Sequence, residues 1–328
     1  MLETFLATLD PMLMFFACIA VGFLLRKTSI LPPDAGKVMA KLITWVFYPA
    51  LSFTSMAKYC TPDKLGQNAT NVLLSVCCVG VAMAIAIPLS RLFVKEKGME
   101  RGIYAYALAF ANSAYMGDPL VLELFGEQML SFYKLYCLPI TLTIYTWGIS
   151  VLVPDNGKKG NALFKLVTPP MVAMLLGIAV GLSGAGAYLP DFAVSTLDAL
   201  KGCMGPVAML LVGFTVGSYP IGEMLKGKLV YLTSILRLTL IPAVILAALF
   251  GFKTLTNLCF GLAIDNTVLF LCFFAVATPL GLNTVVFPES FGGNPKTGAA
   301  MALISHTLGV VSLPLMYALL VWVLGKVA

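Results

Sequence analysis

The chain has 328 residues, of which 59% are hydrophobic and only 11% are charged, and its mean hydropathy is +0.94. A soluble domain with a polar surface does not have this composition, so the sequence predicts an all-α polytopic membrane protein. The net charge of +6 does not indicate nucleic-acid binding, because the basic residues stand singly in short polar stretches.

Apolar stretches long enough to cross a bilayer recur along the whole chain. A helix needs about 20 residues to span a hydrocarbon core of roughly 30 Å. The first stretch has no basic residues before it and no convincing cleavage site, so we expect it to be retained. The ten predicted spans cover residues 5–25, 38–57, 71–93, 102–125, 130–152, 169–182, 194–216, 229–250, 266–291 and 297–323.

A polar stretch divides these spans into two groups of five. We predict a first repeat at residues 1–153, a cytoplasmic linker at 154–165 and a second repeat at 166–328. Residues 11–22 match residues 170–181 at a constant offset of 159, and six of these twelve positions are identical. Pro49 and Pro206, and later Phe125-Gly126 and Phe291-Gly292, continue the match in the same order.

An odd number of spans separates equivalent positions, so the second repeat must enter the membrane from the opposite side. Such an inverted repeat is typical of secondary transporters. Loops on the side of the linker carry thirteen Lys or Arg residues, and loops on the other side carry four. Because basic residues favour the cytoplasm, we predict a cell-membrane protein with both termini on the non-cytoplasmic side.

Residues 110–120, in predicted span four, form a polar patch within an apolar run. Asn112 lies about 15 Å into the span at 1.5 Å per residue, near the middle of the bilayer. Gly117 and Pro119 weaken a helix at this depth, so we expect either two half-helices that meet here or a kinked helix. Ser113 lies in the same patch, and unwound backbone at this depth is tolerated when it lines a wet cavity.

Residues 277–284, in predicted span nine, repeat the pattern with Pro279, Gly281 and Asn283. Two breaks at equivalent positions of two repeats are more specific than either break alone. The amino-terminal ends of half-helices present free amides and positive dipole ends, which suit an anion such as a carboxylate.

Asp118 precedes Pro119, an order typical of a helix cap followed by proline in the first turn. A second hypothesis makes Asp118 the coupling residue, which takes up a proton or helps to hold a cation. Arg237, in predicted span eight, either extends to the headgroups or pairs with the substrate or Asp118.

Other intramembrane polar groups have simpler expected roles. We expect Asp198 and Lys201 to form an ion pair three residues apart, and Lys134 to extend toward the interface. His306, the only histidine, is expected to be packed and hydrogen-bonded, with a proton relay as the alternative. The eight cysteines lie mostly within apolar runs without paired metal-ligand spacing, so no metal site is predicted.

No motif of soluble enzyme chemistry is present, and no cytosolic domain that could hold a nucleotide is predicted. We therefore expect a transporter that needs no bound cofactor and runs on gradients or downhill, with H⁺ and Na⁺ both open as coupling ions. The expected partners are a small organic anion and the lipid bilayer, without nucleic acid, and a homodimer is left open.

Residues 112–120, Asn-Ser-Ala-Tyr-Met-Gly-Asp-Pro-Leu, resemble the crossover of the auxin efflux carrier family, which includes plant PIN carriers and bacterial malonate and malate permeases. Lys41-Leu42, Tyr48 to Leu51, Tyr145 to Gly148 and Ser312 to Leu315 agree with this resemblance. The resemblance implies a scaffold domain of spans one, two, six and seven and a transport domain of the other six spans.

The resemblance also implies an elevator-like movement and a substrate site beside the two breaks. Asn112 matches the asparagine that contacts substrate, and Pro279 matches the second crossover proline. The chain departs from the pattern at Ala111, where PIN carriers have proline, and at Asp118, where an apolar residue is expected. The expected substrate-binding residues are Asn112, Ser113, Gly117, Pro119, Tyr145, Pro279 and Asn283.

The sequence thus predicts a secondary active transporter of small organic anions, such as malonate, malate or auxin-like acids. A sodium-coupled symporter of the bile-acid-carrier type is the nearest alternative. A membrane receptor that binds without transporting is an alternative of another class.

Overall fold

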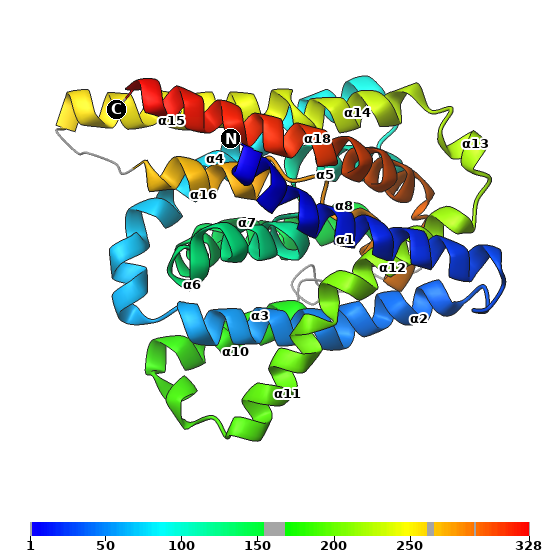
Figure 1. Cartoon of the computed structure of the whole chain (residues 1–328), viewed down its shortest axis with the longest axis horizontal. Coiled ribbons are helices and arrows are strands. Elements are labelled where there is room, and N and C mark those ends of the chain that lie inside the picture. The colour runs from blue at the N-terminus through cyan, green and yellow to red at the C-terminus, as the bar shows by residue number, and fades with distance from the viewer. Residues whose placement is uncertain (1, 154–167, 261–265, 292, 328) are drawn as a thin grey trace.

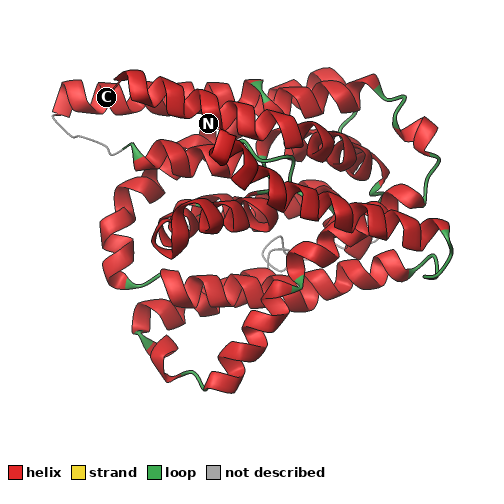
Figure 2. Ribbon diagram, in the orientation of Figure 1, coloured by secondary structure: helices red, strands yellow, loops and turns green. Residues whose placement is uncertain are grey.

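The computed structural model describes residues 2–153, 168–260, 266–291 and 293–327. These residues form helices joined by short loops, and the only β-type pairing among them is one isolated bridge (Figure 2). Within a bilayer, helices satisfy their own main-chain hydrogen bonds, which is why so apolar a chain adopts them. The predicted all-α fold is confirmed for the described residues, whereas the predicted linker at 154–165 lies outside them.

The first half of the chain contains several helices that continue into one another through π-helical turns. Its elements are α1 (Leu2–Lys27), α2 (Ala35–Leu42), η1 (Ile43–Phe47), α3 (Tyr48–Tyr59), α4 (Pro62–Phe93), α5 (Met99–Ala109), η2 (Ser113–Gly117), α6 (Asp118–Tyr136), α7 (Leu138–Thr143), η3 (Ile144–Gly148) and α8 (Ile149–Leu152).

The described part of the second half, from residue 168 onward, begins with a shorter helix that starts at two prolines. Its elements are α10 (Pro169–Ser183), η4 (Ala185–Tyr188), α11 (Asp191–Gly202), α12 (Met204–Gly217), α13 (Ile221–Met224), α14 (Lys228–Leu238), α15 (Leu240–Phe260), α16 (Thr267–Val276), α17 (Asn283–Phe291) and α18 (Lys296–Val327).

Five helical segments among the described residues are long and apolar enough to cross a membrane. They are Ala69–Phe93, Gln128–Leu152, Asp191–Gly217, Lys228–Leu255 and Lys296–Trp322. Pro169–Ser183 and Thr267–Val276 are apolar but shorter. These segments support a multi-pass membrane protein, and the number of ten spans stays a prediction.

Two pairs of helices pack closely along their lengths, α1 with α12 and α3 with α10 (Figure 1). Gly22 of α1 lies so near α12 that a Cβ atom there would be 2.1 Å from the carbonyl oxygen of Leu210. At Gly181 of α10, a Cβ would be 2.6 Å from the carbonyl oxygen of Cys60. Small residues permit such close backbone contact between membrane helices.

The helices α5 and α16 are each too short to cross a bilayer. With 11 and 10 residues, each rises about 15–17 Å, roughly half of the hydrocarbon core. Both helices end at an irregular segment, residues 110–112 after α5 and residues 277–282 after α16. The two segments meet inside the protein and position the candidate site.

The element α6 reverses direction at Gly126, whose φ of 77° is a left-handed conformation that glycine adopts without strain. Asp118 and Lys134 lie on opposite sides of this turn and form an ion pair. In a straight helix these residues would be about 24 Å apart, so the contact requires the reversal. The turn falls between predicted spans four and five.

Candidate functional site

The two interrupted helices are joined by main-chain hydrogen bonds at their breaks. The main-chain nitrogen of Asn112 donates to the carbonyl oxygen of Pro279 over 2.7 Å. The main-chain nitrogen of Gly281 donates to the carbonyl oxygen of Phe110 over 3.1 Å. Ala111 and Leu280 form the antiparallel bridge between them. These bonds satisfy buried backbone groups that would otherwise lack partners.

The break in the first interrupted helix is shorter than the sequence indicated. We expected the chain to open around Gly117 and Pro119, but only residues 110–112 are irregular, and the helix resumes at Ser113. The carbonyl oxygen of Asn112 already accepts bonds from the nitrogens of Met116 and Gly117. Pro119 follows the π-helical turn Ser113–Gly117, within a helix that continues into α6.

Asn112 is 1% exposed, and its side chain contacts His306 of α18. Nδ1 of His306 lies 2.8 Å from the carbonyl oxygen of Ala302, which can only accept, so Nδ1 carries the proton. Nε2 of the neutral ring therefore accepts from Nδ2 of Asn112 at 3.2 Å. The Oδ1 atom of Asn112 is left without a hydrogen-bond partner.

Asn283 begins α17 and connects the same region to two tyrosines. Its Nδ2 atom donates to the hydroxyl oxygen of Tyr106 over 2.9 Å, and the hydroxyl of Tyr115 donates to its Oδ1 atom over 3.4 Å. Tyr106 comes from α5 and Tyr115 from η2, so Asn283 ties both sides of the first break to the second interrupted helix.

Tyr145 of η3 reaches across to α3. Its hydroxyl lies 3.2 Å from Oγ of Ser52, and its ring packs edge-on against Tyr48 at 5.5 Å between centroids. Tyr48 also contacts the ring of Tyr115 at 5.5 Å. Aromatic rings with a polar hydroxyl suit this position, because they fill apolar space while bonding at one end.

Gly117 lies against the hydroxyl group of Tyr133, which donates to the carbonyl oxygens of Ser113 and Phe274 at 3.0 and 3.2 Å. A Cβ atom on Gly117 would be 2.1 Å from that hydroxyl oxygen. Gly117 is therefore needed for close packing rather than for an opening in the helix. The side chain of Pro119 lies outside the described part of the structure.

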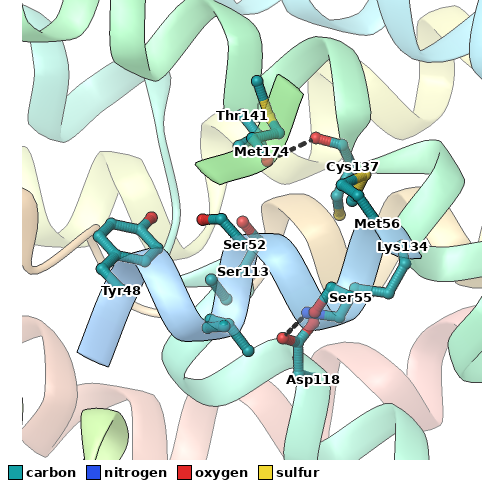
Figure 3. Close-up of a pocket in the computed structure, with 12 residues that line it drawn as sticks. Tyr48, Ser52, Ser55, Met56, Ser113, Asp118, Lys134, Cys137, Thr141 and Met174 are labelled. Atoms are coloured by element: carbon teal, nitrogen blue, oxygen red, sulfur yellow. Dashed lines mark hydrogen bonds and ion pairs between the residues drawn. The ribbon is translucent and has the colours of Figure 1, made fainter. Parts of the chain in front are cut away.

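Asp118 does not cap a helix, and Lys134 does not extend to the interface. The two side chains form an ion pair instead, with 13% and 9% of their surfaces exposed. The expected cap was wrong because the helix already begins at Ser113, so Asp118 stands inside it rather than at its start. The expected extension of Lys134 was wrong because the reversal at Gly126 brings it against Asp118. Figure 3 shows this pair beside Ser55, below Ser52 and Ser113.

A cavity of about 30 Å³ lies at this ion pair, between α3 and the start of the η2–α6 helix. It has room for about two water molecules, since one needs roughly 10–15 Å³ by the same measure. Polar and apolar side chains both line it: Tyr48, Leu51, Ser52, Ser55, Met56, Ser113, Ala114, Asp118, Lys134, Cys137, Thr141 and Met174. Of the predicted substrate-binding residues whose side chains the structure describes, only Ser113 lines this cavity.

Arg237 of α14 is fully buried and reaches neither the headgroup region nor Asp118. Nη1 donates to the carbonyl oxygen of Leu108 over 3.4 Å, and Nη2 donates to the carbonyl oxygen of Val276. These carbonyls lie at the ends of α5 and α16, where the last helical carbonyls lack partners within the helix. The expected extension to the headgroups and the expected pairing with Asp118 were therefore wrong, whereas pairing with the substrate stays a prediction.

The breaks thus collect buried polar groups that are not all satisfied. Oγ1 of Thr278, like Oδ1 of Asn112, has no hydrogen-bond partner. No group of three or more metal-type ligands occurs among the described residues. The arrangement provides hydrogen bonds and one ion pair, which are means of binding a polar solute rather than of breaking bonds.

The model of one family, described as membrane transport protein, matches the chain twice, over residues 7–163 and 161–317. The chain belongs to this family. It is the auxin efflux carrier family, so the resemblance found in the sequence is confirmed. The two matches to this transport family meet within the predicted linker, and the division of the chain into two repeats stays a prediction.

Two archaeal proteins are similar to this member of the family. An uncharacterized transporter of Methanothermobacter thermautotrophicus is 25% identical over 65% of this chain and 69% of its own length. An uncharacterized transporter of Methanocaldococcus jannaschii is 22% identical over 63% of this chain and 68% of its own length. The family and these relatives indicate a transport protein rather than an enzyme.

Several residues of the site had no assigned role in the sequence analysis of this carrier. Tyr106 and Tyr133 supply hydroxyl groups at the breaks, and Ser52 supplies one from the opposite helix. Their signal was a hydroxyl group within a predicted span, which needs a partner when it is buried. That signal is common in membrane proteins, so it does not locate a site without the fold.

Proposed function

We propose that the protein is a secondary active transporter of small organic anions that works by an elevator-type movement. The observation that carries this proposal is the hydrogen-bonded meeting of two half-length helices, at Asn112 and Pro279, in a member of a transporter family. In carriers with inverted repeats, such breaks form the substrate site near the middle of the bilayer.

The proposed architecture has ten spans in two inverted repeats of five. Gly22 and Gly181 occupy equivalent repeat positions, and each packs against a main-chain carbonyl of the other repeat. This reciprocal packing supports a two-fold relationship between the repeats. We place both termini outside the cytoplasm of a cell-membrane protein, on the basis of the basic residues in the predicted loops.

The substrate class follows from the groups at the cavity. The helix that starts at Ser113 begins beside the cavity, because Ser113 and Ala114 line it. A helix start attracts negative charge through free N–H groups and the helix dipole. Lys134 adds an ammonium group that a carboxylate substrate could share with, or take from, Asp118.

Asp118 is the proposed coupling residue. While Asp118 is ionised and bound to Lys134, it competes with an anionic substrate for the same positive groups. Protonation of Asp118 would release Lys134 to the substrate, so uptake of the anion would be linked to uptake of a proton. This arrangement favours proton coupling over sodium coupling.

The elevator-type movement is proposed from the position of the cavity. One wall comes from α3 and α10, and the other comes from η2, α6 and α7. The volume of about 30 Å³ is too small for an organic acid, so these walls must separate before substrate enters. Tyr145 and Ser52 form one of the contacts that such a movement would break.

Flux measurements in proteoliposomes test the proposal. Labelled mono- and dicarboxylates should enter vesicles that hold the purified protein, under an imposed pH gradient and without sodium. Asn112→Ala should reduce this flux at least tenfold, whereas Asp198→Asn, which removes an exposed ion pair, should leave it unchanged. Flux that requires sodium would favour the symporter, and binding without flux would favour the receptor.

A chemical cross-link tests the movement itself. In a background without the eight native cysteines, Ser52→Cys and Tyr145→Cys would be bridged by a short bifunctional methanethiosulfonate, which attaches to each thiol through a disulfide bond. The bridge should stop transport, and reduction of the two disulfides should restore the transport of the unbridged double variant. Full transport by the cross-linked protein would contradict an elevator that separates α3 from η3.

A further inference from the structure

Arg237 lies at the point where the carboxyl-terminal ends of two half-helices converge. Its two terminal nitrogens contact one carbonyl of α5, at Leu108, and one carbonyl of α16, at Val276. α14 packs beside α5, and the side chain of Arg237 is fully buried. The bridge therefore joins the half-helices on the side of the breaks where each helix carries its negative dipole end.

The charge of Arg237 is balanced by main-chain groups rather than by an acidic side chain. Asp118 is bound to Lys134, and no carboxylate among the described residues pairs with Arg237. A helix end carries roughly half a negative charge, so two converging ends together offset about one positive charge. A buried charge in a membrane protein is costly unless such compensation is present.

Main-chain carbonyl oxygens at the ends of broken helices are also the groups that hold small inorganic cations in carriers. We propose that Arg237 acts as a tethered cation, which fills a carbonyl site that would otherwise take a monovalent cation such as Na⁺. The protein thus carries its own countercharge for the two helix ends. Arg237 is a positioning residue that holds the breaks in register, and it needs no contact with the substrate.

This proposal does not depend on which solute is carried, because it concerns the stability of the two breaks. It predicts that loss of the guanidinium group opens a cation site. Free guanidinium at millimolar concentration, far below denaturing levels, should enter that site, and Na⁺ should do so more weakly. Failure of the transport assay would leave this test unaffected.

The experiment measures the melting temperature of purified variants in detergent, in a choline chloride buffer. Arg237→Ala should lower the melting temperature by several degrees, on the order of 5 °C or more. Guanidinium should restore it in a saturable manner, and urea should not. Wild-type protein should not respond, nor should Arg26→Ala, which loses a guanidinium group bonded to Ser218 at the surface.

Arg237→Lys provides a second variant if Arg237→Ala does not fold. An ammonium group keeps the charge but cannot bridge both carbonyls in the same way, so Arg237→Lys should melt at a lower temperature than the wild type. If Arg237→Ala folds, Arg237→Lys should melt at a higher temperature than Arg237→Ala. Melting of Arg237→Lys at the wild-type temperature would overturn the bridge. Equal responses of Arg237→Ala and the wild type to guanidinium would overturn the tethered-cation role.

Discussion

The main-chain nitrogen of Asn112 donates a hydrogen bond to the carbonyl oxygen of Pro279 across 2.7 Å, between residues 167 positions apart in the chain. Neither residue belongs to a regular helix. The bond holds the breaks of α5 and α16 together and leaves the side chain of Asn112 free to contact His306. This contact fixes how the two interrupted helices meet at the candidate site.

Substitution of Gly117 by alanine should destabilise the protein. The new methyl group would displace the hydroxyl of Tyr133, which bonds two carbonyl oxygens, so we expect a loss of about 1–3 kcal/mol. This loss of stability is measured by thermal unfolding of the variant and the wild type. Gly80→Ala, in α4 with open space around it, is the matched control and should be neutral. An unchanged melting temperature for Gly117→Ala would contradict the packing.

Breaking the ion pair between Asp118 and Lys134 should cost more than replacing both partners. Asp118→Asn leaves a buried ammonium group unpaired, and Lys134→Gln leaves a buried carboxylate, each at about 3–5 kcal/mol. The double variant should recover part of that loss. The measurement is a double-mutant cycle on thermal unfolding.

The exposed pair Asp198 and Lys201 is the control for that cycle. These side chains are 51% and 39% exposed, so the same substitutions should change stability by about 0.5 kcal/mol or less. Additive losses at Asp118 and Lys134, with no recovery in the double variant, would argue against an energetically important buried pair.

His306→Phe should destabilise the protein through Asn112. The phenyl ring cannot accept the amide hydrogen of Asn112, so a buried donor loses its partner at a cost of about 1–3 kcal/mol. Asn112→Leu in the same protein should make the His306 substitution less harmful, because the orphaned amide is gone. Independent effects of the two substitutions on the melting temperature would refute the contact.

Gly22→Ala should loosen the packing of α1 on α12. The added Cβ would lie 2.1 Å from the carbonyl oxygen of Leu210, and such overpacking costs about 1–3 kcal/mol. Gly251→Ala in α15 has no atom nearby and serves as the control. A melting temperature equal to that of the control would mean that the two helices can separate without cost.

Local sequence features predicted the class of protein and the general position of the two interrupted helices. Composition predicted a membrane protein because long apolar helices are the form in which such a chain can satisfy its backbone within lipid. The Pro, Gly and Asn residues near 112 and 279 indicated two interrupted helices, since these residue types disfavour a continuous helix. These are local properties, and they can be recognised from neighbouring residues alone.

The position of the first break and the side chains that meet there depend on contacts between distant segments, which the sequence does not reveal. The helix opens at residues 110–112, rather than at Gly117, because main-chain bonds to residues 279–281 replace the helical ones. Lys134 reaches Asp118 because the chain reverses at Gly126. Arg237 bridges Leu108 and Val276 because two helix ends converge on it, a result of packing between segments far apart in the chain.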